Sequence, residues 1–132
     1  MSIQLSDTVR NAMADAMEVA IGTAPHLHIR SGAQPANCAA ADSGTTLVDI
    51  TLPSDWLTAA SSGQKAKNGT WSGAATNGGT AGHFRIKDST NNTCHMQGSC
   101  GQGSGDMSLV NTNVQVSQPF QVNSFTYTRG NG

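Results

Sequence analysis

The sequence is poor in charged residues, and this limits the partners that it can bind. Asp, Glu, Lys and Arg make up only 11% of the 132 residues, against roughly 25% in an average globular domain. The seven basic residues are spread along the chain, and the formal net charge is −1. Nucleic-acid binding needs clustered Lys and Arg to neutralise phosphates. We therefore expect no nucleic-acid partner, and a neutral polar surface that packs against another molecule at little cost in charge desolvation.

Long hydrophobic runs are also missing. No segment approaches the roughly 20 apolar residues that cross a membrane, so we expect no membrane partner. The first 12 residues lack a basic region followed by an apolar stretch, which is the pattern of a secretory signal. The sequence thus predicts synthesis in the cytoplasm without export by that route.

Cysteines are few, and none is paired with another at a metal-binding spacing. Cys38, Cys94 and Cys100 form an odd set without a C-x-x-C motif. Reduced thiols are the simplest interpretation for a cytoplasmic product. A disulfide between Cys94 and Cys100 stays an alternative, provided that their strands are neighbours.

Motifs that carry chemistry are absent too. His26 and His28 share one face of a predicted strand, with room for a metal ion between them. A zinc site built from His83, His95 and Cys94 is conceivable, but Cys94 and His95 are adjacent in a strand and face opposite sides. No local motif supports Cys94 as a nucleophile. We expect no catalytic residue, no cofactor and no bound metal.

The acidic residues show no facing pair of the kind that glycosidases use. Asp42, Asp88 and Asp106 fall among Gly, Ser and Asn, where Asp commonly forms turns. A weak calcium site at Asp88, with Asn91 and Asn92, is the less favoured alternative to an Asx turn.

The sequence contains one clear helical pattern, over residues 6–21. Ser6 or Asp7 is placed to cap the helix, and Gly22 to end it. Apolar side chains recur at three- and four-residue spacing, namely Val9, Met13, Ala16, Met17 and Ala20. Such a stripe usually packs on the protein's own core, although it also suits a partner surface.

Beyond Pro25 the pattern changes to short β-strands separated by turns. Alternation or β-rich composition predicts strands at 26–30, 45–52, 70–74, 82–87, 93–98, 106–110, 114–116 and 119–128. Phe120 and Val122 share one phase of the last strand, while Phe125 and Tyr127 share the other. The switch near 123–124 indicates a β-bulge or a strand that changes its packing partner. Residues 54–60 suggest one helical turn, residues 61–69 an exposed loop, and residues 98–105 a mobile Gly-rich loop.

These elements predict a single mainly β domain over residues 1–132. One N-terminal α-helix would accompany an antiparallel β-sandwich or jelly roll of about seven or eight strands. The 15 glycines and the shortage of charge fit a turn-rich β domain.

The sequence resembles a family of small structural proteins of tailed bacteriophages and prophages. The resemblance covers nearly the whole chain in order, with LHIRSGAQP at 27–35 and GTAGHFRI at 79–86 among its segments. The others lie at 41–45, 52–56, 69–71, 94–98, 106–109, 111–113 and 125–131. The region around Cys100 departs from the family, because its loop is longer and richer in glycine.

The resemblance implies a non-enzymatic virion protein. From size, low charge and β character we expect a capsid decoration (cement) protein, located on the capsid surface and made in the host cytoplasm. Its partners would be the major capsid protein and copies of itself, as a homo-oligomer, most simply a trimer. Candidate partner contacts are Ser2, Ile3, Gln4, Leu5, Met13 and Met17.

A tail or fibre component that binds a host glycan is the alternative function. It would use the loops at 61–69 or 98–105. The supply of aromatic rings for stacking on sugars is thin, at 5% of the chain, and a core would need most of them.

Overall fold

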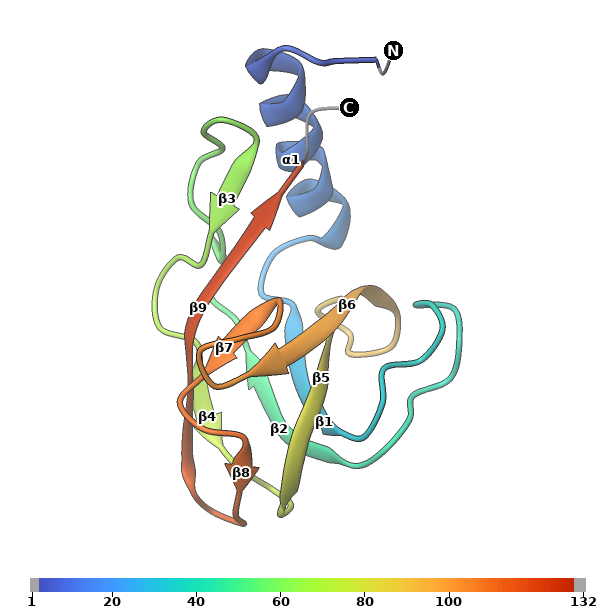
Figure 1. Cartoon of the computed structure of the whole chain (residues 1–132), viewed down its shortest axis with the longest axis vertical. Helices are drawn as coiled ribbons and strands as arrows, with labels where there is room; N and C mark the ends of the chain where they lie inside the picture. Colours follow the sequence, from blue (N-terminus) through green and yellow to red (C-terminus); the bar gives the residue numbers. More distant parts are fainter. Residues whose placement is uncertain (1–2, 130–132) are drawn as a thin grey trace.

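A computed structural model describes residues 3–129 of the chain (Figure 1). Within this range one helix is followed by nine strands. The elements are α1 (Asp7–Ile21), β1 (His26–Ser31), β2 (Thr46–Thr51), β3 (Gln64–Ala66), β4 (Ser72–Ala74), β5 (Gly79–Lys87), β6 (Cys94–Gly101), β7 (Met107–Leu109), β8 (Asn113–Val114) and β9 (Pro119–Thr128). The mainly β class with one N-terminal helix is therefore confirmed.

The strands form one strongly curled sheet, a half-barrel, rather than two stacked sheets. The strand order is β2-β1-β5-β6-β7-β9-β3, and β4 pairs with β9 while β8 pairs with β5. Curling brings β4 back beside β2, where the amide of Thr76 donates to the carbonyl of Leu47 at 2.8 Å. The predicted sandwich or jelly roll is not what forms, because one sheet wraps around the core by itself. The sheet is also mixed, since β6 and β7 run parallel.

The register of the central strands separates an apolar face from a polar face. Leu27 lies opposite Ile86 and Ile29 opposite Phe84, and all four side chains are buried in the core. Successive residues of a strand point to opposite faces of the sheet. The residues between them, including His28 and Arg85, therefore face away from this core.

Aromatic rings form the centre of the core. Trp56 and Trp71 have ring centroids 6.0 Å apart, Trp71 and Phe125 5.6 Å, and Phe84 meets Phe125 edge-on at 5.7 Å. The indole N–H groups of Trp56 and Trp71 donate to the carbonyls of Gly22 and Asn68. Both tryptophans are thus fully buried without an unpaired donor.

The predicted β-bulge in the last strand is confirmed. Ser108 pairs with Ser124 but Leu109 pairs with Val122, so Asn123 is the extra residue of β9. The insertion lets Val122 and Phe125 both point into the core although three residues separate them. The extra residue therefore explains why the apolar positions of the last strand change phase near 123–124.

The helix has the predicted bounds. The Ser6 hydroxyl accepts from the amide of Val9 at 3.3 Å, and Gly22 ends the helix with φ of 94°. A positive φ of this size is costly for residues with a Cβ, which explains the glycine. Among residues 3–129, no helix is both long and apolar enough to cross a membrane.

Three local predictions are wrong. Residues 54–60 form no helical turn, and Leu57 instead makes a β-bridge with Lys67. Residues 61–69 include β3, in which Lys65 is buried, because this segment pairs with the end of β9. Residues 98–101 belong to β6 rather than to a loop. In each case long-range pairing overrode a local composition rich in Ser and Gly.

The same strand excludes a disulfide between Cys94 and Cys100. Both residues lie in β6, six positions apart. At about 3.3 Å per residue, their Cα atoms are roughly 20 Å apart, whereas a disulfide joins Cα atoms no more than about 7 Å apart.

Replacing a core valine of β9 tests this packing. Val122→Ala should lower the free energy of unfolding by about 2 kcal/mol, because Val122 is fully buried and the change removes two carbon atoms and leaves a cavity. Chemical denaturation measures the loss. Val116→Ala is the matched control at an exposed valine and should change stability little. Equal losses in the two variants would contradict the assignment of the core.

Candidate functional site

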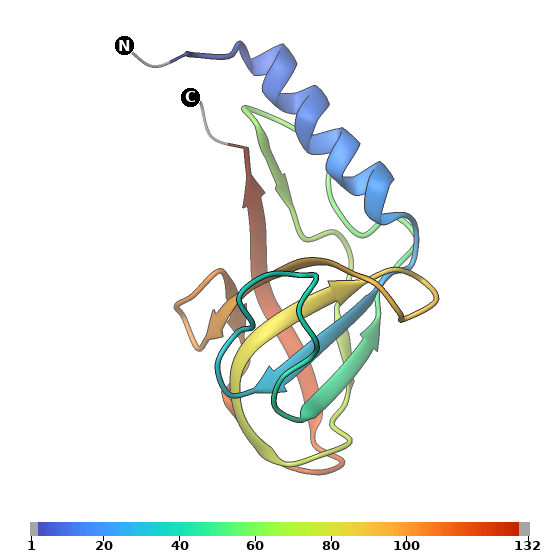
Figure 2. The ribbon, with the colours of Figure 1, turned by 90° about the vertical axis from the view of Figure 1, so that its right-hand side faces the viewer.

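The N-terminal helix stands apart from most of the sheet. Figures 1 and 2 show α1 at one end of the molecule, beside β3 and the end of β9. Only Ala14 and Ile21 of its residues are buried. The helix therefore covers little of the core and leaves most of its own surface uncovered.

Polar contacts hold the helix in this position. The ammonium of Lys65 in β3 donates to Asp15 at 2.6 Å and contacts Glu18 at 2.8 Å. Burial alone would lower the pKa of Lys65, but the hydrogen bonds and charges of Asp15 and Glu18 raise it above its usual value. Lys65 therefore stays charged and ties the helix to the strand.

Arg10 provides a second tie near the start of the helix. Its guanidinium donates to Asp7 at 2.9 Å and to the carbonyls of Ser62 and Arg129 at 3.0 Å each. The side of α1 that faces the protein is thus largely polar. Its apolar members are the buried Ala14 and Ile21, together with Met17, which packs against the core.

The opposite side of α1 is apolar and exposed. Six apolar residues lie on this side. At 3.6 residues per turn they cover roughly a third of the helix circumference, and no charged residue lies among them. Val19 is 79% exposed, Val9 44% and Met13 36%, and the three alanines of the face are exposed as well. We call these six residues the apolar helix face: Val9, Ala12, Met13, Ala16, Val19 and Ala20.

This arrangement corrects the interpretation of the helix as a cover for the core. Of the apolar stripe seen in the sequence, Val9, Met13, Ala16 and Ala20 are exposed, and only Met17 packs against the core. The helix is rotated because its polar residues meet Lys65, the 61–63 turn and Arg129. No local pattern could reveal those partners.

The candidate partner contacts lie at or near this face. Ile3 is 81% exposed, Gln4 is exposed and Leu5 is half-buried. Met13 lies on the apolar helix face, whereas Met17 is half-buried against the core. Ser2 falls outside the described residues. The structure thus places Ile3, Gln4 and Met13 at the exposed end of the molecule, and their contact with a partner stays a prediction.

A second concentration of functional groups lies on the outer face of the sheet. The register pairs His26 with Lys87, His28 with Arg85 and Arg30 with His83 across β1 and β5. Sequence spacing had suggested scattered basic residues, but three of the seven meet here. We call this the outer polar layer; its charged members are Arg30, Asp42, Asp49, Arg85 and Lys87.

Asp42 neutralises part of this positive charge. It accepts from Arg85 at 2.5 Å and from Lys87 at 2.6 Å, with Arg30 at 3.8 Å. Partial burial alone would raise the pKa of Asp42, but the hydrogen bonds from Lys87 and Arg85 lower it to about 2. Asp42 is therefore a structural counter-ion and not the simple turn residue that we predicted.

His28 lies in the same layer in a neutral state. Arg30 donates to its Nδ1 at 3.2 Å, so its Nε2 must carry the proton that is shared with the Asn91 side-chain oxygen at 2.7 Å. Burial lowers the pKa of His28, against the charge of Asp49, which raises it. His26 instead contacts Asp49 at 2.8 Å. The space between the two histidines is thus occupied by protein groups.

The residues of the conceivable zinc site and of the alternative calcium site form no cluster of metal-ligating side chains. Among residues 3–129 no group of three or more His, Cys, Asp or Glu side chains is placed to hold a metal ion. Asp88 forms the expected turn, accepting from Thr90 and from the amide of Asn92. Asp106 instead links to β6, where it accepts from the amide and hydroxyl of Ser99.

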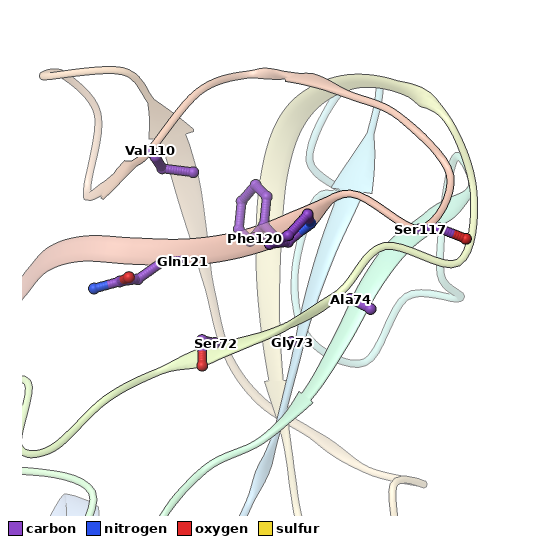
Figure 3. A pocket seen from close by; sticks show the side chains of 8 residues that line it. Ser72, Gly73, Ala74, Val110, Ser117, Phe120 and Gln121 are labelled. Atoms are coloured by element: carbon purple, nitrogen blue, oxygen red, sulfur yellow. The ribbon is translucent and has the colours of Figure 1, made fainter.

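A groove of about 540 Å³ lies beside the β4–β9 pair (Figure 3). Ser72, Ala74 and Gln121 are among the residues that line it, with Val110 and Phe120. None of its eight lining residues carries a titratable side chain, so the groove offers no general acid or base.

The aromatic residues do not provide a sugar-stacking surface. All six lie within the described part of the chain. Five are buried, and Tyr127 is half-buried against the core. The glycan-binding alternative therefore lacks the exposed rings that its chemistry requires.

Removing the Asp42 carboxylate should destabilise the protein in a pH-dependent way. Asp42 has a pKa near 2 when folded and about 3.8 when unfolded. Its contribution is thus fully present above pH 4 and lost as the pH falls towards 2. Asp42→Asn should cost about 2 kcal/mol at pH 7 and progressively less below pH 4, as measured by denaturation at each pH. Asp55→Asn is the control at an exposed carboxylate; an Asp42→Asn deficit that is independent of pH would contradict the counter-ion role.

Comparison with known proteins found no matching family model, no matching curated protein and no matching solved structure. The resemblance to phage virion proteins therefore stays a prediction. The function has to be inferred from the surfaces of the molecule itself.

Proposed function

We propose that this chain is a non-enzymatic structural subunit that self-associates through α1 and decorates a bacteriophage capsid. One observation carries the proposal: the apolar helix face is exposed although the helix has polar contacts of its own. The resemblance of the sequence to small virion proteins supports the placement on a capsid.

The occupant of the apolar helix face is a second copy of the chain. The charged residues of α1 lie outside this face, and Arg10, Asp15 and Glu18 already have ion-pair partners within the chain. Two or three copies can therefore bring these faces together without desolvating an unpaired charge. Ala12, Ala16 and Ala20 recur every four residues, which allows close approach of the helix axes.

The symmetry of homo-oligomers also favours self-association through the apolar helix face. A homo-oligomer uses one self-complementary patch on every subunit, and a threefold axis fits a protein that sits at threefold positions of a shell. The helix lies at one end of the molecule, away from most of the sheet (Figure 2). Three helices can then meet at an axis while the sheets point outwards.

The N-terminal segment is the proposed contact with the major capsid protein. Ile3 is the most exposed large apolar residue of the described chain and precedes the helix. In an oligomer built on α1, the three copies of this segment would lie together at one end. They would then bind the capsid through repeated weak contacts that reinforce one another.

The alternative, a glycan-binding tail component, has less support. The two loops that it would use are partly taken up by β3 and β6. The aromatic side chains that would stack on sugars are in the core.

A charge on the apolar helix face should break the oligomer. The wild-type protein should behave as a trimer, near three times its mass of 13.6 kDa, in size-exclusion chromatography with light scattering. Ala16→Lys should give a monomer with an unchanged circular dichroism spectrum, because Ala16 is exposed in the single chain. Ala36→Lys, at an exposed alanine of the 32–45 loop, is the control and should leave the mass unchanged. A monomeric wild-type protein would refute self-association through α1.

A charge at Ile3 should instead weaken capsid binding. Ile3→Asp should reduce co-sedimentation with undecorated capsids of the phage or prophage that encodes the chain, by about tenfold or more in apparent affinity. The oligomer mass should stay that of the wild type. Val116→Asp is the matched control, because Val116 is also an exposed β-branched residue and lies far from the N-terminal segment in the sequence. Unchanged capsid occupancy of Ile3→Asp would exclude the N-terminal segment as the contact.

A further inference from the structure

Two cysteines that are far apart in the sequence meet on the outer face of the sheet. Cys38 lies in the 32–45 loop, and Cys94 begins β6. The Cys38 side chain lies close enough to Cys94 to contribute to the raised pKa of the Cys94 thiol. Both line one cleft with Asp42, Arg85 and Lys87.

The backbone on both sides of this pair is anchored to β5. The Arg85 guanidinium donates to the carbonyls of Asn37, Cys38 and Ala40 at 3.0–3.2 Å. On the other side, Cys94 pairs with Lys87 in the β5–β6 ladder. The two thiols are thus brought together by residues two positions apart on one strand.

We propose that Cys38 and Cys94 are a dithiol pair that a small-molecule disulfide such as oxidised glutathione converts to an intramolecular disulfide. The geometry favours it, because both side chains line one cleft and the backbone segments that carry them are held to neighbouring positions of β5. The inference does not depend on the proposed function.

The reaction is a double thiol–disulfide exchange. One cysteine thiolate attacks glutathione disulfide, releases one glutathione thiolate and leaves a mixed disulfide. The second cysteine then loses its proton, attacks the protein sulfur and displaces the second glutathione. Overall the two protein thiols lose two hydrogens, and one glutathione disulfide becomes two molecules of reduced glutathione.

The order of attack follows from the surroundings of Cys94. Burial, together with the neighbouring Cys38, raises the pKa of Cys94 to about 12. Cys94 therefore keeps its proton near neutral pH, and Cys38 attacks first. Cys94 attacks in the second step. Cys38 is then part of the mixed disulfide, so it no longer contributes to the raised pKa of Cys94.

Cys100 has no place in this chemistry. It is half-buried against the core, and burial raises its pKa to about 11. Its distance from Cys94 along β6 excludes a bond between them. The odd number of cysteines thus resolves into one pair and one inert thiol.

The bond would fix the 32–45 loop to the sheet. The loop is otherwise held by side-chain contacts of the outer polar layer, which weaken when Asp42 is protonated. A disulfide between Cys38 and Cys94 closes a long loop, and such bonds stabilise by restricting the unfolded chain.

The test is to equilibrate the purified full chain with oxidised glutathione and map its disulfides. We expect the intact mass to fall by two hydrogens, a non-reducing peptide map that joins Cys38 to Cys94, and alkylation of Cys100 alone. The melting temperature should rise by roughly 5–15 °C over that of the reduced protein. Cys100→Ser should oxidise in the same way, whereas Cys94→Ser should stop at a glutathione adduct on Cys38.

The peptide map of the wild-type protein decides the question even if a variant fails to fold. Three alkylatable cysteines after equilibration, or a bond that includes Cys100, would overturn the proposal. So would an adduct on Cys38 that Cys94 never displaces.

Discussion

The Arg85 guanidinium organises one side of this molecule. It is almost fully buried on the outer face of the sheet, where an unpaired charge would be costly. It therefore donates to Gln97, Asp42 and three loop carbonyls at once. Satisfying those donors requires the 32–45 loop to fold over the sheet. This loop also contacts Arg30 through two backbone carbonyls and Lys87 through Asp42. The polar layer, the low pKa of Asp42 and the meeting of Cys38 with Cys94 all depend on it.

The sheet thus has two different faces. Its concave face holds aromatic and aliphatic residues around Trp71 and Phe125, and non-directional burial stabilises it. Its outer face holds charges that need specific partners in a specific geometry. A chain with only 11% charged residues has placed five of them in this one layer. The remaining surface is left largely to neutral polar groups.

The helix follows the reverse arrangement. Its polar residues hold it to β3 and to the 61–63 turn, and its apolar residues face outwards. A monomeric protein gains nothing from such an orientation, because exposed apolar surface is unfavourable in water. In the proposed oligomer, a second copy of the chain would supply the missing burial, and the proposed capsid contact would give the exposed N-terminal segment a partner. Cys38 and Cys94 lie at the outer polar layer rather than on α1, so the proposed oxidation and the proposed self-association would be separable.

The sequence by itself determined the helix bounds, the main strands and the bulge in β9. These depend on local signals: a capping Ser6, a terminating Gly22, alternation in 26–30 and a change of apolar phase at 123–124. Only the tertiary structure decided the curled single sheet, because strand order depends on pairing between distant segments such as β3 with β9. It also decided which side of α1 faces inwards, since Lys65 and Arg129 are remote from the helix in sequence. The same holds for the cysteines: the sequence favoured reduced thiols and left a Cys94–Cys100 bond as an alternative, whereas one strand holds those two apart and a folded loop brings Cys38 near Cys94.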